Sequence, residues 1–405
     1  MRKIRFALHW QILIALVMGV LYGVFFRDYV PYISWMGDVF IRALKMIIIP
    51  LILSSIISGV TNIGSAENLG RLGLKTILYY VMTSTLAILV GLAFVNIIQP
   101  GVGADLGFHK EVGALDVIED SFGQTLIKII PVNIFEALSS ARMLSVIFFA
   151  IVFGFFITRS GRKTRHFLTD FFNSVFEVMM KITMFIIRFA PFGVFGIVAY
   201  QISESEDLSV LAQTMGVYMI TVFAGLAFHA LITLPLIAKF IGKVNPLKHF
   251  RAVTTPLLTA FSTSSSSATL PLTMQAVENK AGVSNKISSF TLPLGATINM
   301  DGTALYECVA AIFIAQAYGV DLGFGEQVIV VFTALLASIG AAGIPMAGLV
   351  MITVVLSAVG LPLEGVGLIL AVDRILDMFR TATNVWSDSC GAVVIAKSEG
   401  EALNV

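Results

Sequence analysis

The sequence predicts an all-α polytopic membrane protein, and two observations lead to that fold class. Hydrophobic residues make up 57% of the 405 residues and charged residues only 13%, whereas soluble proteins carry about 25% charged residues. Apolar stretches of roughly 20 residues, enough for a helix to cross a bilayer, recur along the whole chain. A net charge of +1 argues against a nucleic-acid partner, and two cysteines provide no disulfide framework.

Six continuous apolar stretches precede residue 239, and each is long enough to form a membrane-spanning helix. Two less regular apolar regions follow, and each precedes another long segment. The pattern does not fit a secretory signal followed by a soluble domain. The six stretches cover residues 9–26, 39–59, 75–98, 140–158, 172–200 and 213–238, the less regular regions cover 250–278 and 328–361, and the last two segments cover 287–318 and 366–396.

The charges of the loops predict the orientation, because basic loops stay in the cytoplasm. The N-terminal segment 1–5, the loop 159–165 and the stretch 239–251 are basic and are expected inside. The segments 100–120 and 203–207 are rich in acidic residues and are expected outside. Six spans before residue 239 satisfy all of these positions.

The two less regular regions are predicted to enter the membrane and return on the same side. If both crossed it, the loop 319–327, which holds Asp321 and Glu326 but no Lys or Arg, would lie in the cytoplasm. As re-entrant hairpins they place that acidic loop outside. The prediction is therefore eight transmembrane helices plus two re-entrant helical hairpins, with both termini in the cytoplasm.

Each hairpin has a stretch at its centre that weakens a helix. The first reads FSTSSSSATLP over residues 261–271, and the second reads ASIGAAGIPMAG over 337–348, with Gly343 and Pro345 near its middle. Non-helical backbone at membrane depth is tolerated only where protein or a water-filled cavity surrounds it. The hairpins enter from opposite sides as inverted repeats, which point to a transporter's binding site near the bilayer midplane. The alternative for the serine run is a polar contact between helices.

Polar side chains interrupt the next span, whose residues 291–307 read TLPLGATINMDGTALYE and include Asn299, Asp301 and Glu307. A charge at the bilayer centre costs roughly 2.5–3.5 kcal/mol on insertion scales. Gly302 beside Asp301 predicts local unwinding that releases backbone carbonyls. Carboxylate, amide and carbonyl oxygens are hard ligands, and together they predict a cage for sodium. The alternative is a structural hydrogen-bond network.

The last span carries a stripe of charged and polar residues. At about 100° per residue, Asp373, Asp377, Arg380, Asn384 and Asp388 fall on one face of the stretch DRILDMFRTATNVWSD. A stripe with both signs of charge inside a membrane must face a cavity or a partner. A buried ion-pair network that holds helices together is the alternative.

These side chains fit an acidic amino acid. The guanidinium of Arg380 suits the side-chain carboxylate, and Asp377 suits the α-ammonium group. The α-carboxylate is expected at the hairpin backbone near Ser265 and Ser266, together with Asn384, because the N-terminus of a broken helix attracts anions.

The four stretches SSSSATLP, NMDGTALYE, GAAGIP and DRILDMFRTATNV, at these intervals, resemble the glutamate/aspartate transporter family, also called the dicarboxylate/amino acid:cation symporters. The resemblance covers nearly the whole chain. It implies an elevator-type transporter, not an enzyme, that forms a homotrimer in which each protomer works alone. A static scaffold would hold a mobile transport domain that slides across the membrane, with the second hairpin as its gate.

The implied division of the chain alternates between scaffold and transport domain. The scaffold would take residues 1–74 (spans 1 and 2) and 100–201 (spans 4 and 5). The transport domain would take span 3 (75–99), span 6 (202–243), the first hairpin (244–283), span 7 (284–320), the second hairpin (321–362) and span 8 (363–397), and a cytoplasmic tail would follow at 398–405.

The resemblance also implies the residues of the site. Positions matching the substrate contacts are Arg380, Asp377, Thr381, Asn384, Thr303, Ser265, Ser266 and Gly348. Positions matching sodium ligands form three sets: Gly295, Asn299, Asn384 and Asp388; Thr297, Met300 and the hairpin backbone at Ser338, Ile339 and Ala341; and Tyr80, Thr83, Ser84, Asn299 and Asp301. The hydroxyl groups of the stretch YYVMTS fit a cation site on their own chemistry.

Glu307 matches the glutamate that is tied to proton and potassium coupling in animal members, whereas several archaeal sodium-only members have a neutral residue there. A buried carboxyl group favours its protonated form, so Glu307 is a candidate proton carrier, with a structural role as the alternative. Animal members of the family carry an arginine on the last helix, and Arg374 lies on that helix about one turn earlier. Sodium is the expected coupling ion, with protons as an additional or an alternative one, and no organic cofactor is expected.

Uptake of L-aspartate or L-glutamate is the predicted function, and a proton-driven or a C4-dicarboxylate symporter of the same family is the alternative. Asp377 would repel a second carboxylate and suits an ammonium group, and a neutral amino acid would leave Arg380 unpaired. A channel needs a ring of equivalent groups, and the serines have neither a nearby histidine nor a G-x-S-x-G elbow. The short loops predict a prokaryotic inner membrane.

Overall fold

The chain is described by a computed structural model over residues 8–64, 70–103, 127, 129–140, 142–204, 208–341 and 347–405. Within these ranges every regular element is a helix and none is a strand, so the predicted all-α class is confirmed there. Several predicted features lie outside the described residues: the basic segment 1–5, most of the acidic loop 100–120, residues 205–207, and Gly343 and Pro345 of the second hairpin.

The first half of the chain forms the helices expected from its apolar stretches. A single span was predicted over 172–200, but the structure has two helices there, and their axes differ by 53° at a break just before Pro191. The elements are α1 (Leu8–Phe25), η1 (Arg27–Tyr32), α2 (Trp35–Gly64), α3 (Gly70–Ile98), α5 (Ile134–Ser139), α6 (Met143–Arg159), α7 (Arg162–Ile187) and α8 (Ala190–Glu204).

The sixth predicted span is interrupted by a short π-helical turn. It consists of α9 (Leu208–Phe228), the π turn η2 (His229–Thr233) and α10 (Leu234–Phe240). Such a turn adds one residue to the helix and changes the direction of the side chains around it. The helix α11 (Pro246–Ala252) follows, and the side chain of Asn245 caps its N-terminus by accepting from Leu247 N and Lys248 N.

The serine run is a break between two helices, as predicted. The helix α12 (Thr254–Thr263) ends at Ser264, which has a left-handed backbone with a φ of 51°. Ser265 is extended, and its hydroxyl accepts a hydrogen bond from Ala268 N at the start of α13 (Ser266–Ala276). A π turn, η3 (Val277–Ala281), completes this half of the first interrupted region.

The seventh predicted span is broken at a different residue from the one expected. Unwinding was predicted at Gly302, but the non-helical residues are Asn299 and Met300, between α14 (Asn285–Ile298) and α15 (Asp301–Ala317). Gly302 is helical, and a Cβ atom there would lie 2.6 Å from Arg380 O. The glycine therefore allows α15 to pack closely on the last helix instead of opening the backbone.

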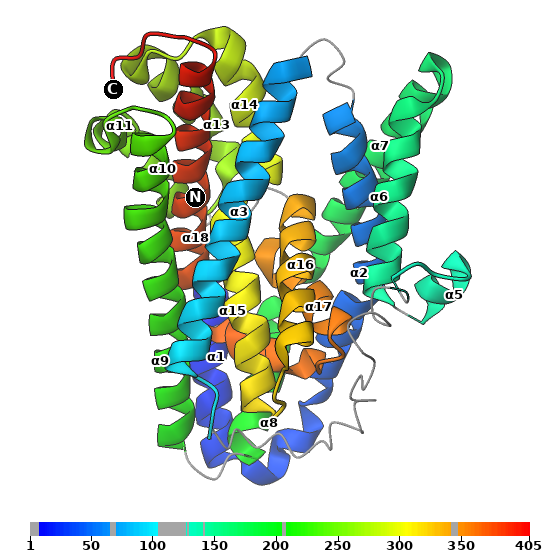
Figure 1. The fold of residues 1–405 in the computed structure, drawn as a ribbon. Helices are drawn as coiled ribbons and strands as arrows, with labels where there is room; N and C mark the ends of the chain where they lie inside the picture. The colour runs from blue at the N-terminus through cyan, green and yellow to red at the C-terminus, as the bar shows by residue number, and fades with distance from the viewer. Residues whose placement is uncertain are drawn as a thin grey trace, which may run out of the picture.

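The remaining elements are α16 (Phe324–Gly340), α17 (Ala347–Ala358), η4 (Leu363–Gly365) and α18 (Val366–Ser398). The helices sort into two groups by their contacts (Figure 1). One group joins α2 to α6, α7 and α8, and α8 to α1. The other surrounds α15 and α18, which contact α3, α9, α14 and α17.

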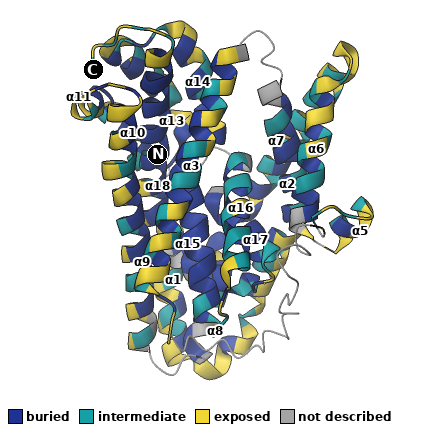
Figure 2. Cartoon of the chain, viewed as in Figure 1, coloured by how far each residue is buried: buried dark blue, intermediate teal, exposed yellow. Residues whose placement is uncertain are grey.

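Burial separates the centre of this bundle from its surface (Figure 2). Every residue of α15 from Asp301 to Ala315 is buried. In contrast, α1 and α3 expose apolar side chains such as Ile14, Leu74 and Leu78. Exposed apolar faces of this size suit contact with lipid chains.

In the described part of the chain, four helical stretches are long and apolar enough to cross a membrane, and the bent pair α7–α8 would add a fifth. The helix α18 has the length of a span, but its charged and polar stripe lowers its hydropathy. The apolar parts of α1, α6, α16 and α17 are shorter. The four stretches are Trp35–Thr61, Arg71–Ile98, Ala212–Phe240 and Asn285–Ala317.

Candidate functional site

Arg380 lies at the centre of the charged stripe and is only 1% exposed. Its Nη2 donates to Asp377 Oδ1 at 2.9 Å and lies 3.0 Å from Asp373 Oδ1. Its Cζ lies 3.8 Å from the centre of the Tyr306 ring, a cation–π contact. In the described part of the chain, its Nε and Nη1 have no hydrogen-bond partner. Buried donors of this kind are costly unless a ligand accepts from them.

The second hairpin leaves room beside these donors. A Cβ atom on Gly348 would lie 2.8 Å from Arg380 Nη1 and 3.2 Å from Thr303 Cγ2. The first turn of α17, the start of α15 and the middle of α18 therefore meet at the guanidinium. Three of the predicted substrate residues, Arg380, Thr303 and Gly348, are brought together there.

Asn384 links the start of α15 to α18. Its Oδ1 accepts from Gly302 N at 2.8 Å, and its Nδ2 donates to Thr303 Oγ1 at 3.3 Å. Thr381 is buried on the same helix, next to Arg380. The tip residues Ser265 and Ser266 are also buried, and α12 and α13 both pack on α18.

A second polar centre surrounds the fully buried carboxylate of Asp301. Ser84 Oγ donates to Asp301 Oδ1 at 2.6 Å, and Thr83 Oγ1 lies 3.3 Å from both Asp301 Oδ1 and Asn299 Oδ1. On the other oxygen, Ser387 Oγ donates to Asp301 Oδ2 at 2.6 Å. Four members of the predicted third sodium set, Thr83, Ser84, Asn299 and Asp301, thus meet between α3 and the start of α15.

The predicted first sodium set adjoins this centre. Asn299 Nδ2 donates to Asp388 Oδ1 at 2.8 Å and to Ser387 Oγ at 3.0 Å. A Cβ atom on Gly295 would lie 2.5 Å from Asp388 Oδ1 and 2.7 Å from the hydroxyl of Tyr80. That hydroxyl donates to Thr291 O at 2.7 Å. Carboxylate, amide, hydroxyl and carbonyl oxygens form a donor set that suits a hard cation such as sodium.

The predicted second sodium set is more open. Thr297 is exposed, and its hydroxyl donates to the carbonyl oxygens of Pro293 and Leu294. Met300 and Ser338 are buried, and Ala341 N donates to Ser338 O at 3.2 Å. The helices that carry the set, α14 and α16, contact each other, and Ile339 on α16 faces Gly59 of α2.

Glu307 is fully buried in the middle of α15. Neither of its carboxyl oxygens has a hydrogen-bond partner within the ranges that the structure describes. The structural role considered for Glu307, a carboxyl group held by hydrogen bonds, therefore has no support among the contacts of the described residues.

Two contacts of the Asp301 centre were not predicted from the sequence. Ser387 lies between the two predicted cation centres, and His229 Nε2 lies 3.1 Å from Asp301 Oδ2. The sequence held a signal for His229, because an ionisable residue within an apolar span is rarely without function. Ser387 had no signal beyond its place beside Asp388.

Interrupted helices that surround buried charges define a class, the secondary transporters. The chain matches the sodium:dicarboxylate symporter family over residues 8–398. It therefore belongs to that family, whose members are membrane transporters and not enzymes.

Relatives of known function cover nearly the whole chain. It is 37% identical over 411 residues to a proton/sodium-glutamate symport protein of Geobacillus stearothermophilus, with 99% of this chain and 96% of the relative covered. It is 38% identical over 450 residues to excitatory amino acid transporter 3 of Oryctolagus cuniculus, with 96% and 85% covered. It is 35% identical over 416 residues to the proton/glutamate-aspartate symporter of Escherichia coli, with 98% and 94% covered.

Proposed function

We propose that this protein is a secondary active symporter that takes up L-aspartate or L-glutamate together with sodium. The observation that carries the proposal is Arg380, a buried guanidinium with two donor nitrogens that have no partner in the described part of the chain. A carboxylate on the substrate would accept from Nη1, the nitrogen beside Gly348, and charge-assisted bonds of this type are among the strongest in proteins. The relatives named above transport glutamate or aspartate, which supports the same substrate class.

Each polar group of an acidic amino acid has a partner in the proposed site. Arg380 binds the side-chain carboxylate, and Asp377 accepts from the α-ammonium group. Asn384 and the backbone at the first tip hold the α-carboxylate. The remaining contacts come from Thr303, Thr381, Gly348, Ser265 and Ser266.

Sodium is the proposed coupling ion because the oxygen donors fit it. The centres around Asp301 and Asp388 consist of buried carboxylate, amide and hydroxyl oxygens. The second sodium set, which includes Thr297 and Met300, would be completed by the backbone at Ser338, Ile339 and Ala341. Protons are the proposed additional ion, with Glu307 as carrier, because its carboxyl group is fully buried and has no hydrogen-bond partner among the described residues.

The proposed topology has eight transmembrane helices, two re-entrant hairpins and cytoplasmic termini, in a prokaryotic inner membrane. The group around α15 and α18 would form the transport domain, and the group around α2 would form the scaffold of a homotrimer. The two contact groups of the fold support this division. Movement of the group around α15 and α18 past the group around α2 would expose the site to each side of the membrane in turn.

Uptake into proteoliposomes tests the proposal. Radiolabelled L-aspartate, L-glutamate and the C4-dicarboxylate succinate are offered with an inward sodium gradient at equal pH, and separately with an inward proton gradient without sodium. We expect accumulation of at least one amino acid that requires external sodium. Succinate accumulation without amino acid uptake would support the dicarboxylate alternative, and uptake on the proton gradient alone would overturn sodium coupling.

A further inference from the structure

His229 and Asp301 form a buried polar pair that joins two distant parts of the chain. Both side chains are fully buried, and the ring Nε2 lies 3.1 Å from Asp301 Oδ2. His229 Nδ1 has no hydrogen-bond partner among the described residues. This arrangement fits the tautomer with its proton on Nε2, which makes the ring a hydrogen-bond donor to the carboxylate.

The π turn that begins at His229 is itself held in place by the last helix. Trp386 Nε1 donates to Ala230 O at 2.9 Å. A π turn leaves some carbonyl oxygens without their usual helical partners, and this bond supplies one. The direction in which His229 points is therefore fixed by α18, the helix that also carries Asp388.

The two oxygens of Asp301 have different neighbours. Oδ1 faces hydroxyl groups of α3, Ser84 at 2.6 Å and Thr83 at 3.3 Å. Oδ2 faces Ser387 at 2.6 Å and His229 at 3.1 Å. A hydroxyl group can turn its proton away and present a lone pair to a cation, whereas a ring N–H has a fixed direction.

We propose that His229 is a positioning residue for the cation centre at Asp301. Its N–H holds Oδ2, and this leaves Oδ1 directed toward Thr83, Ser84 and the amide oxygen of Asn299, where a sodium ion would bind. His229 does not itself contact the ion. The inference rests on the proposed sodium coupling, and it assigns to the histidine a role in sodium affinity that is separate from substrate binding.

Two substitutions of His229 distinguish the loss of the N–H donor from the loss of the packing volume of the ring. The amide nitrogen of a glutamine reaches about as far as Nε2, whereas that of an asparagine reaches only as far as Nδ1. His229→Gln is expected to keep the apparent sodium affinity within about threefold, and His229→Asn is expected to weaken it about 10- to 100-fold, the usual cost of losing a group that orients a metal ligand. The matched control is His249→Asn, because His249 is equally buried and bonds to Ser389.

The readout is sodium binding to the purified protein in detergent without substrate, measured as the sodium concentration that gives half of the maximal rise in Tm. The Km for amino acid at saturating sodium is measured in parallel and is expected to stay unchanged, which a general loss of structure would not allow. If His229→Asn does not fold, Trp386→Phe replaces it. This variant leaves the His229 ring in place but removes the N–H that donates to Ala230 O. A weaker sodium affinity is again expected.

The outcomes distinguish this inference from the proposed function. A wild-type protein without any response to sodium would contradict sodium coupling itself. A wild-type response that is unchanged in His229→Asn, or in Trp386→Phe where that variant replaces it, would overturn the positioning role. Equal losses in the glutamine and asparagine variants would also overturn it, because they would show that ring packing and not the donor matters.

Discussion

In the described part of the chain, only one of the three nitrogens of Arg380 has hydrogen-bond partners, and this asymmetry suits a residue that selects a ligand. Asp373 and Asp377 both lie near Nη2, so the two carboxylates keep the guanidinium charged and oriented. Nη1, which lies beside Gly348 and has no partner in the described part of the chain, is left for an incoming carboxylate. A lysine would keep the positive charge but would lack the planar fork that binds two oxygens at once.

We therefore expect Arg380→Lys to lower the efficiency of L-aspartate and L-glutamate uptake about 10- to 100-fold, the value of one or two charge-assisted hydrogen bonds. The matched control is Arg374→Lys on the same helix. Arg374 is 22% exposed and its Nη1 lies 3.7 Å from Asp377 Oδ2, so its replacement should change uptake less than about fivefold. Equal losses in both variants would contradict the selective role of Arg380.

Gly348 provides the space beside the same guanidinium. Gly348→Ala would place a methyl group 2.8 Å from Arg380 Nη1, where we propose that the substrate carboxylate binds. The Km for the amino acid should rise about tenfold, because overpacking a site costs about 1–3 kcal/mol.

The control is Gly216→Ala in α9, where an added Cβ meets no atom within 4 Å. That variant should transport normally and gain slightly in stability from the better helix propensity of alanine. Initial rates over a range of substrate concentrations measure both variants. An unchanged Km in Gly348→Ala would place the carboxylate elsewhere.

At the scale of elements, composition located one helix break correctly but gave the wrong role to a glycine. Four consecutive serines correctly located the break at Ser264 and Ser265, because serine side chains compete for backbone hydrogen bonds. Gly302 was expected to unwind a helix, yet it serves close packing on α18. Its small size has two structural uses, and only the position of the neighbouring helix decides between them.

The C-terminal end of α18 is held by ion pairs to the start of α3. Glu399 accepts from Arg71 Nη2 at 2.7 Å and from Lys75 Nζ at 2.6 Å. Nearby, Glu401 bonds to Ser284, and Asn404 N donates to Ala281 O at 2.9 Å. These contacts join the ends of three helices at the face where the tail lies.

The hydrogen bonds from Arg71 and Lys75 lower the pKa of Glu399 from 4.5 to about 2. A carboxyl group with a lowered pKa stabilises the fold above its unfolded pKa, and that stabilisation is lost as the pH falls from about 4.5 toward 2. Glu399→Gln should therefore lower Tm slightly at pH 7, and the difference from the wild type should shrink as the pH falls below about 4.5. The effect should also weaken in high salt, because the ion pairs lie at the surface and Arg71 is 73% exposed.

Thermal unfolding in detergent between pH 3 and pH 7 measures this difference. Glu364→Gln is the control, since its carboxylate lies 3.7 Å from Lys45 Nζ in a different part of the molecule. A difference between Glu399→Gln and the wild type that grows as the pH falls would contradict the ion-pair explanation.

At the scale of the whole molecule, the sequence indicated which residues carry charge but not which of them meet. The stripe on α18 followed from helical periodicity alone, because all its members share one helix. The contacts of Asp301 with Ser84, His229 and Ser387 join three separate elements. Their meeting depends on how helices cross, which no local pattern specifies.

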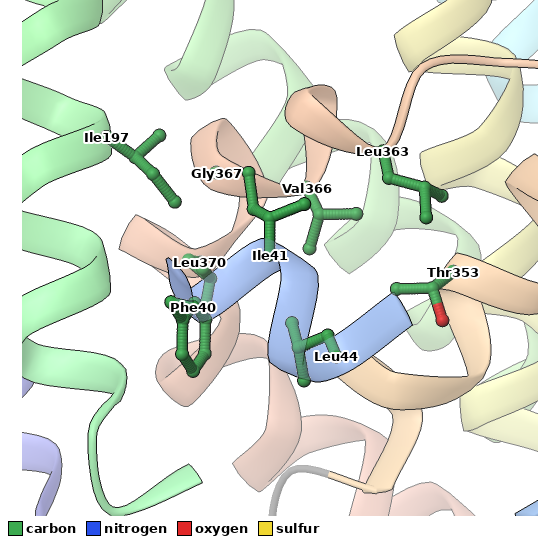
Figure 3. A pocket seen from close by; sticks show the side chains of 9 residues that line it. All are labelled: Phe40, Ile41, Leu44, Ile197, Thr353, Leu363, Val366, Gly367 and Leu370. Atoms are coloured by element: carbon green, nitrogen blue, oxygen red, sulfur yellow. The ribbon is translucent and has the colours of Figure 1, made fainter. Parts of the chain in front are cut away.

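The boundary between the two groups of helices passes through an apolar gap (Figure 3). Side chains of α2 and α8 line one side of this gap, and those of α17, η4 and the start of α18 line the other, including Phe40, Leu44, Ile197, Leu363 and Leu370. Apart from Thr353, the residues that line the gap are apolar, and the ion pair between Lys45 of α2 and Glu364 of η4, at 3.7 Å, crosses the same boundary beside it. An apolar surface has few polar contacts to break when its two sides slide past each other. The gap therefore suits the moving boundary that the proposed elevator mechanism requires.

A disulfide across this boundary tests the movement. A Cβ atom on Gly367 would lie 3.4 Å from Ile197 Cβ, close to the 3.5–4.5 Å of a disulfide. In the double variant Ile197→Cys and Gly367→Cys, oxidation should therefore join α8 to α18 and reduce uptake by about tenfold or more, because no step of transport completes without movement. Reduction should restore uptake, while the sodium-dependent rise in Tm should persist in the oxidised protein.

The control places the same kind of bond within the proposed scaffold. A Cβ atom on Gly19 would lie 3.1 Å from Val198 Cβ, so Gly19→Cys with Val198→Cys joins α1 to α8 without crossing the boundary. The native residues Cys308 and Cys390 are buried and stay in both variants. If oxidation stops uptake in both, the loss reflects rigidity in general. If it stops uptake in neither while gel mobility shows that both bonds have formed, α8 and α18 move together, and the division into scaffold and transport domain is wrong at this boundary.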